Sequence, residues 1–129
     1  MSQENLEIVR RAYAAPALLV DAPHVASDAE FDFSDVYPDQ PVLRGMEAMR
    51  VFQGVGPWRG SIRFEPERYW EIDAERVLAL VRVSATGHGS GAPVDIRVAH
   101  EFTLRNGLIV RFKVHSDPAR ALKGVGLEE

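Results

Sequence analysis

Three residues combine side chains that can donate or accept a proton with positions that predict burial. Tyr13 lies on the apolar stripe of a predicted helix, and His100 lies in an apolar row of a predicted strand. Asp35 shares the strand parity of Phe31 and Phe33, so it is expected to point inward with them. Removal of a proton beside a carbonyl needs a base, and the oxyanion that develops needs hydrogen-bond donors. Tyrosine, aspartate and histidine side chains can supply both. The sequence therefore predicts Tyr13, Asp35 and His100 as a candidate catalytic trio.

Each member of this trio also has a purely structural interpretation. Tyr13 could fill the core, and Asp35 begins a proline-rich loop in which it could form a turn. His100 could be a core histidine that bonds to a neighbour. Asp32 has the opposite parity to Asp35 and is expected to face water. The sequence leaves the catalytic and structural interpretations open.

The strands that position His100 are predicted by an alternating pattern between residues 96 and 117. One side is apolar except for a single histidine, and the other side is largely polar, which is typical of a sheet with one covered face. The first strand places these residues inward: Val98, His100, Phe102 and Leu104. The second strand places these inward: Val110, Phe112 and Val114. Asn106-Gly107 predicts a tight hairpin turn between them.

The remaining elements predict an α+β fold in one domain, residues 1–129. Helices are expected over residues 2–15 and 46–53, with a short last helix that Ser116 or Asp117 caps and Pro118 begins. Strands are expected over residues 30–34, 61–73, 77–86, 94–105 and 108–115, whereas residues 17–28 are ambiguous and include a candidate short helix. Helices followed by antiparallel strands predict a cone-shaped curved antiparallel sheet wrapped around the N-terminal helices. Such a cone has a mouth that could hold a ligand.

Composition excludes several classes of function. The chain has 129 residues, a net charge of −4 and no cysteine, which excludes disulfides and thiolate chemistry. An acidic chain without a basic block predicts no nucleic-acid binding. We expect no membrane span, no metal site, no cofactor and a cytoplasmic protein. His24 lies in the ambiguous segment and could rim the pocket.

A hydrophobic small molecule is the expected partner, because most candidate lining residues are apolar. Core filling is the alternative for these side chains. The residues expected to contact the ligand are Phe33, Met49, Phe52, Trp58, Phe102 and Phe112.

Five stretches carry a resemblance to a known family: QENLEIVRRAYAA, AEFDFSDVYPDQPVLRGMEAM, RFEPERYWEID, RVLALVRVSATGHGSG and VAHEFTLRNGLIVRFKVHSDPARAL. On these stretches the chain resembles the nuclear transport factor two-like fold, and within it the SnoaL-like domains. The resemblance implies an α+β barrel shaped as a cone, and a homodimer that pairs through the exposed face of the sheet. The chain departs from the family at APALLVDAPHVASD, where a regular second helix is usual.

Similarity to ketosteroid isomerases suggests roles for the trio. Tyr13 stands where those enzymes have an oxyanion-hole tyrosine, Asp35 stands near their base, and His100 replaces a protonated aspartic acid that donates to the oxyanion. Epoxide hydrolases of this fold place Arg and Asp inward, where this chain has aliphatic residues at Val81, Val83 and Val114.

Two classes of function follow as expectations. The first is a small-molecule-binding SnoaL-like domain that could act as a cofactor-independent isomerase or cyclase, by proton transfer on a hydrophobic carbonyl compound. The second is a non-catalytic ligand-binding or dimeric interaction module. Whether the chain is an enzyme stays open at this point.

Overall fold

The structure is a computed structural model that describes residues 2–14, 19, 24–37, 39, 42–49, 62–86 and 93–127. Its elements, in chain order, are α1 (Ser2–Ala14), β1 (Val25–Asp32), β2 (Leu43–Arg44), β3 (Arg63–Glu71), β4 (Arg76–Thr86), β5 (Pro93–Arg105), β6 (Leu108–His115) and α3 (Pro118–Gly124). Residues 46–49 are helical and begin the predicted second helix. The rest of that helix, with Phe52, and the loop with Trp58 lie outside the described residues.

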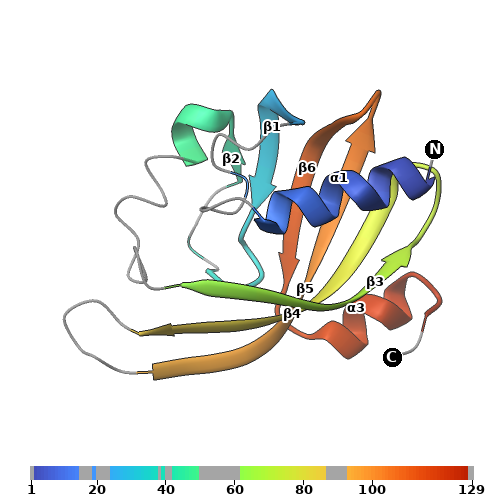
Figure 1. Cartoon of the computed structure of the whole chain (residues 1–129). Coiled ribbons are helices and arrows are strands. Elements are labelled where there is room, and N and C mark those ends of the chain that lie inside the picture. The colour runs from blue at the N-terminus through green and yellow to red at the C-terminus, as the bar shows by residue number, and fades with distance from the viewer. Residues whose placement is uncertain are drawn as a thin grey trace.

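The six strands form one curved, open sheet in the order β2-β1-β6-β5-β4-β3. The helix α1 crosses one face of this sheet, and the strands β4 and β5 bend strongly below it (Figure 1). The predicted α+β cone is therefore confirmed. The predicted run of antiparallel strands is wrong at one place, because β1 pairs in parallel with β6.

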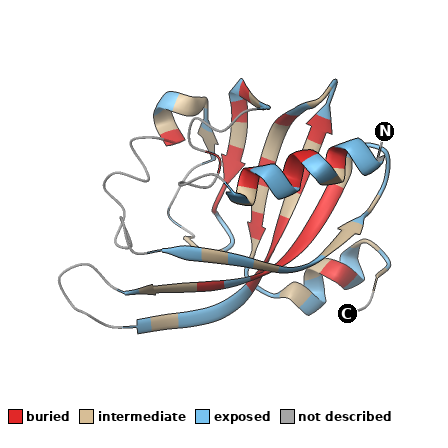
Figure 2. Cartoon of the chain, viewed as in Figure 1, coloured by how far each residue is buried: buried red, intermediate tan, exposed pale blue. Residues whose placement is uncertain are grey.

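The core lies between α1 and the face of the sheet that it covers (Figure 2). The inward row of β5 is buried as predicted, with Val98, His100, Phe102 and Leu104 each at most 3% exposed. The predicted turn is also confirmed, because Asn106 and Gly107 have φ angles of 51° and 76°.

The strand β6 differs from the prediction near its start. The register shifts beside Leu104, so that Leu104 pairs with Ile109 whereas Thr103 pairs with Arg111. This β-bulge turns Ile109 into the core and leaves Val110 only partly buried. Val110 still packs against the core as predicted, but Ile109 is the fully buried residue at the head of the row.

The region after the first helix corrects two further expectations. The strand β1 begins at Val25, so residues 25–28 are a strand and not a short helix. It ends at Asp32, and the chain then turns, with the amides of Val36 and Tyr37 both donating to the carbonyl of Phe33 at 3.1 and 2.8 Å. Because this turn interrupts the alternation, parity with Phe31 no longer fixes the direction of later side chains.

The outer face of the sheet is partly covered by α3. Asp117 caps this helix by accepting a hydrogen bond from the amide of Arg120, and Pro118 follows, as predicted. Leu122 of α3 packs on Leu78 and Ala99, which makes a second, smaller apolar cluster. Ala99 is therefore buried, although its strand parity places it on the polar side.

Candidate functional site

The centre of the candidate site is a hydrogen bond between the helix α1 and the strand β5. The Tyr13 hydroxyl lies 2.7 Å from Nδ1 of His100. The imidazole is 1% exposed, and its ring centroid lies 4.8 Å from that of Phe112 and 5.6 Å from that of Phe64. We call these two hydrogen-bonded residues the Tyr13–His100 pair. Strand parity thus places the histidine inside the cone, as predicted.

Burial keeps both members of the Tyr13–His100 pair uncharged. It lowers the pKa of His100 to about 3, with a smaller contribution from the charge of His115. Burial also raises the pKa of Tyr13 well above its ordinary value. At neutral pH the pair is therefore a neutral phenol bonded to a neutral imidazole, and the imidazole is a weak base.

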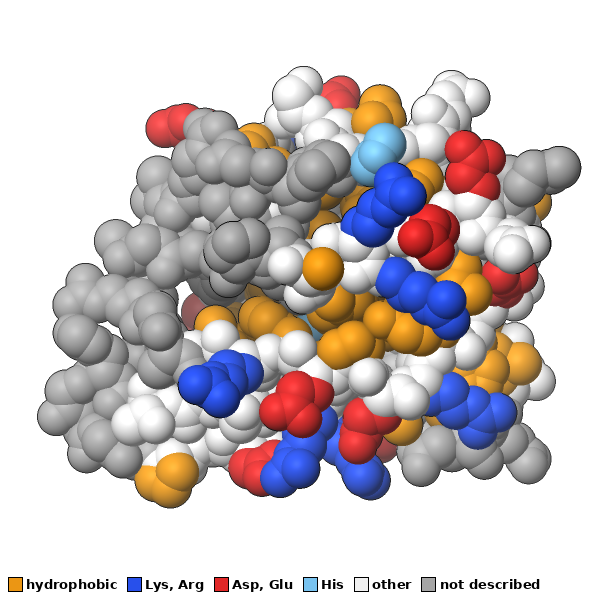
Figure 3. All heavy atoms as spheres, viewed as in Figure 1, with side chains coloured by type: hydrophobic (Ala, Val, Ile, Leu, Met, Phe, Trp, Pro, Cys, Tyr) orange, Lys and Arg blue, Asp and Glu red, His pale blue; other side chains and the backbone are white. Residues whose placement is uncertain are grey.

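An apolar wall leads from the surface to this pair. Ile96 shares a face of β5 with Val98 and His100, yet it is 49% exposed, whereas Val98 is 3% exposed. Ile62, just before β3, is 37% exposed, and Phe64 is partly buried against the core. Figure 3 shows hydrophobic side chains gathered across the middle of this face, between α1 and β3. The exposure of apolar side chains on these strands therefore rises from the buried pair toward Ile96 and Ile62.

Asp35 does not point into the cone, so the expectation about its direction is wrong. It is exposed and lies in the turn that follows β1. Its carboxylate accepts hydrogen bonds from the amide and the hydroxyl of Ser116, at 2.6 and 2.8 Å. These bonds lower the pKa of Asp35. The structure therefore brings together Tyr13 and His100 but leaves Asp35 outside.

The described residues that were expected to contact a ligand are deeply buried. Phe102, Phe112 and Met49 are at most 2% exposed, and Phe33 is 9% exposed. The ring centroid of Phe112 lies 5.2 Å from that of Phe102 and 6.0 Å from that of Phe33. These side chains form the floor around the histidine. The inward aliphatic residues Val81, Val83 and Val114 are also buried.

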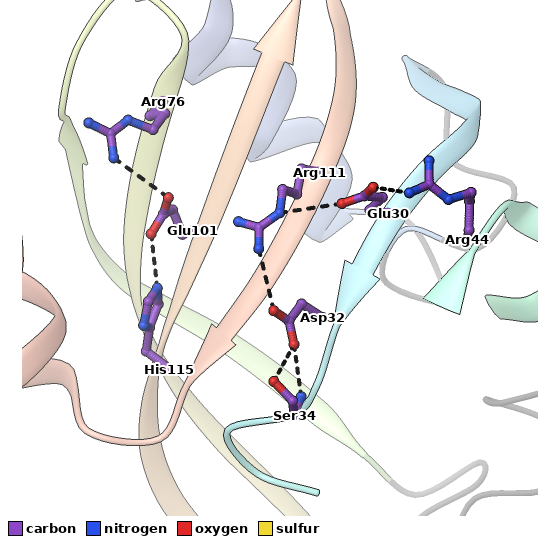
Figure 4. A network of polar contacts seen from close by, with 8 residues as sticks. All are labelled: Glu30, Asp32, Ser34, Arg44, Arg76, Glu101, Arg111 and His115. Atoms are coloured by element: carbon purple, nitrogen blue, oxygen red, sulfur yellow. Dashed lines mark hydrogen bonds and ion pairs between the residues drawn. The ribbon is translucent and has the colours of Figure 1, made fainter. Parts of the chain in front are cut away.

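A charged network on the outer face includes a carboxylate that the sequence did not predict to be buried. Asp32 faces the polar side as expected, but it is only 6% exposed. Burial acts to raise its pKa, but hydrogen bonds from Ser34 and the charges of Lys113 and Arg111 outweigh it, so the pKa is lowered. Figure 4 shows how Arg111 joins Asp32 to Glu30. The spacing Asp32-Phe33-Ser34 is typical of an Asx turn and could have indicated this arrangement.

A separate cavity of about 790 Å³ lies beside the first half of α1. It is lined by residues that include Glu4, Glu7, His24, Asn106 and Leu108. His24 therefore lines this cavity and not the wall around His100. No group of three metal-binding side chains occurs among the described residues. Within the same ranges, no helix has the length and apolar run needed to cross a bilayer.

Comparisons with known proteins identify the family of this chain. The model of the SnoaL-like domain matches residues 11–112. The chain belongs to the SnoaL-like domain family. The predicted resemblance is thereby confirmed. A search of curated proteins gives no match.

Solved structures of similar proteins extend over nearly the whole chain. An NTF2-like protein of unknown function from Burkholderia pseudomallei K96243 is 22% identical, with a TM-score of 0.72 over 95% of this chain and 98% of its own. A protein named as a SnoaL-like polyketide cyclase, from Jannaschia sp. CCS1, is 17% identical, with a TM-score of 0.72 over 98% and 94%. TerC, co-crystallised with polyporic acid, is 16% identical, with a TM-score of 0.73 over 95% and 98%. At these identities the likeness concerns the fold alone.

Proposed function

We propose that this SnoaL-like domain binds an apolar small molecule inside the cone through one oxygen atom of that molecule. The observation that carries the proposal is the Tyr13–His100 pair, a polar centre in an otherwise apolar wall of described residues. Ligand sites are commonly apolar, with a few polar groups that fix orientation. A carbonyl or hydroxyl oxygen is the ligand group that suits a neutral phenol and imidazole.

The burial of the wall supports an apolar ligand body. Exposure falls along one face of β5, from the exposed Ile96 to His100 and Phe102 in the interior. A ligand that enters at Ile96 and Phe64 replaces water on apolar side chains, which favours binding. Phe33, Met49, Phe102 and Phe112 would then form its floor. Phe52 and Trp58 stay predicted contacts.

Titration with 2-acetylnaphthalene, an aromatic ketone, tests this proposal. The wild type should bind it saturably in a calorimetric or NMR titration. Tyr13→Phe should weaken binding about fivefold, because it removes one hydrogen bond, to the ligand or to His100, and such a bond is worth about 1 kcal/mol. Thr103→Ala, on the outer face of the same strand, is the matched control and should bind like the wild type. No saturable binding, or equal affinity in Tyr13→Phe, would overturn the proposal.

A cofactor-independent isomerase or cyclase is the second candidate. It is supported by structural neighbours whose names include SnoaL-like polyketide cyclase. Tyr13 would donate to the oxyanion, and His100 or Asp35 would be the base. Neither base is well suited, because His100 has a pKa of about 3 and Asp35 faces solvent.

Turnover of enolisable ketones distinguishes this candidate from binding alone. The wild type is compared with Asp35→Asn and His100→Ala. A catalytic site requires that at least one variant lose most of the rate, whereas equal rates in all three proteins remove the catalytic role.

We also propose that the domain forms a homodimer through the outer face of the sheet. Charged side chains of both signs alternate on this face, and Figure 4 shows Glu101 and Arg111 among them. Such a mixture can pair with itself across a two-fold axis. Light scattering after size exclusion tests this at several salt concentrations. A monomer at micromolar concentration would overturn it.

A further inference from the structure

Arg10 differs from most arginines of this acidic chain. Seven arginines among the described residues form ion pairs with carboxylates, and these are Arg11, Arg44, Arg76, Arg82, Arg97, Arg105 and Arg111. Within the described ranges, Arg10 is outside this set. Its guanidinium carbon lies 5.4 Å from the centroid of the Tyr69 ring, and the residue is exposed. A guanidinium over an aromatic face is held in orientation while its donors still point to solvent.

The ring below Arg10 belongs to the aromatic cluster of the candidate site. Tyr69 packs on the core, and its ring makes an edge contact with Tyr13 at a centroid distance of 6.2 Å. Tyr13 in turn bonds to His100. Arg10 and Tyr13 are three residues apart on α1, so they lie on one side of the helix as neighbours. An exposed cation therefore lies over the outer side of this aromatic cluster, one helical turn from Tyr13.

We propose that Arg10 recognises a carboxylate of the ligand, so that the cone binds apolar carboxylic acids that also carry a separate carbonyl or hydroxyl oxygen. This inference rests on the proposed function, since it uses the same site. The carbonyl or hydroxyl oxygen forms a hydrogen bond with the Tyr13–His100 pair, the apolar body lies on the aromatic rings, and the carboxylate stays at the surface. Guanidinium and carboxylate match in geometry through two parallel hydrogen bonds. The exposed position spares the ligand the cost of burying its charge.

Two probes that differ in charge test the inference: 6-acetyl-2-naphthoic acid and its methyl ester. Both carry the ketone and the same ring system, but only the acid is an anion at neutral pH. The wild type should bind the acid about fivefold more tightly than the ester, as expected for an ion pair at an exposed site. The preference should weaken as salt is raised.

Arg10→Gln should bind both probes with equal affinity. Arg68→Gln is the matched control, because Arg68 is exposed and also lies over a ring, that of Trp70 at 4.8 Å, on the side of the sheet that packs on α3. This control should keep the preference for the acid. Equal binding of acid and ester by the wild type, or a preference that survives in Arg10→Gln, would overturn this inference while the proposed function stands. Failure of the ester and of 2-acetylnaphthalene to bind would overturn both.

Discussion

Two histidines on neighbouring strands occupy opposite faces of the same sheet. His100 of β5 is 1% exposed and bonds to the hydroxyl of Tyr13. His115 of β6 lies on the outer face, where its Nε2 is 2.9 Å from a carboxylate oxygen of Glu101. Glu101 directly follows His100 in the sequence, so a step of one residue separates an apolar surrounding from a charged one.

The face of the sheet on which a residue lies decides whether its polar contacts are with neutral or with charged groups. Inside the cone, burial disfavours charge, so the polar contact is between neutral groups. On the outer face, water and opposite charges support ionised groups, and the hydrogen bond from His115 is the largest cause of the lowered pKa of Glu101. Four predictions test this contrast, from the largest expected effect to the smallest.

The largest effect is expected from a cavity on the inner face. Phe102→Ala should lower the free energy of unfolding by about 3–5 kcal/mol, because it empties a fully buried site. Thr103→Ala, one residue further and on the outer face, should change it by less than about 1 kcal/mol. Urea denaturation of the two variants measures this. Similar losses in both would contradict the difference between the faces.

Acid should destabilise the fold through His100 before it affects the carboxylates. The folded pKa of about 3 lies below the unfolded value of 6.5, so the unfolded chain binds more protons between these values. Stability is therefore complete above pH 6.5 and should fall by up to about 1.4 kcal/mol per pH unit below it. Denaturant unfolding between pH 7 and 4.5 measures the slope.

His100→Gln is the control for this slope, because glutamine does not titrate. Its stability should depend far less on pH in the same window. The lowered pKa values of Asp32, Asp35 and Glu101 act elsewhere, since their stabilisation is present above about pH 4 and is lost below it. A wild type whose stability is constant from pH 6.5 to 4.5 would contradict the assignment of a buried, neutral histidine.

Removal of the phenol hydroxyl should have an intermediate effect. Tyr13→Phe keeps the ring but takes away the hydrogen-bond partner of His100 Nδ1, which should lower the unfolding free energy by about 1–3 kcal/mol. A double-mutant cycle with His100→Gln measures the coupling between the two side chains. A coupling energy near zero would mean that the hydrogen bond contributes nothing to stability.

The smallest effect is expected on the outer face. Glu101→Gln removes a charge that interacts with His115 at 2.9 Å and with Arg76 at 3.8 Å. Because water and salt screen such pairs, we expect a loss of at most about 1 kcal/mol, which shrinks as salt is added. Thermal unfolding at low and high salt measures it. A loss as large as that of Phe102→Ala would contradict the proposed contrast.

Alternation predicted the inside and outside of β5 because that strand keeps an unbroken register with β4. The turn at Asn106 and the cap at Asp117 were also predictable, because each depends on local chemistry. The SnoaL-like fold was recognised from its series of motifs. These features are local or repeat along the chain.

Other features depend on contacts that the local sequence does not contain. Parity gave the wrong direction for Asp35, because β1 ends three residues earlier and the chain turns there. Its partner, Ser116, is 81 residues away. The bulge that buries Ile109 fully, with Val110 only partly buried, also arises from tertiary packing, as does the burial of Ala99 under α3. The Tyr13–His100 bond was not predictable as a contact, although both residues were placed inward.

The parallel pairing of β1 with β6 has a consequence for how the protein is made. Phe31 near the start of the chain lies beside Phe112 near its end. During synthesis, α1 and β1 therefore leave the ribosome long before β6 is made, and β6 is the strand that completes their hydrophobic surroundings. Contacts between such distant segments are slow to form because a long loop must close first. The hairpin of β5 and β6 is therefore made long after the N-terminal elements whose apolar side chains it helps to bury.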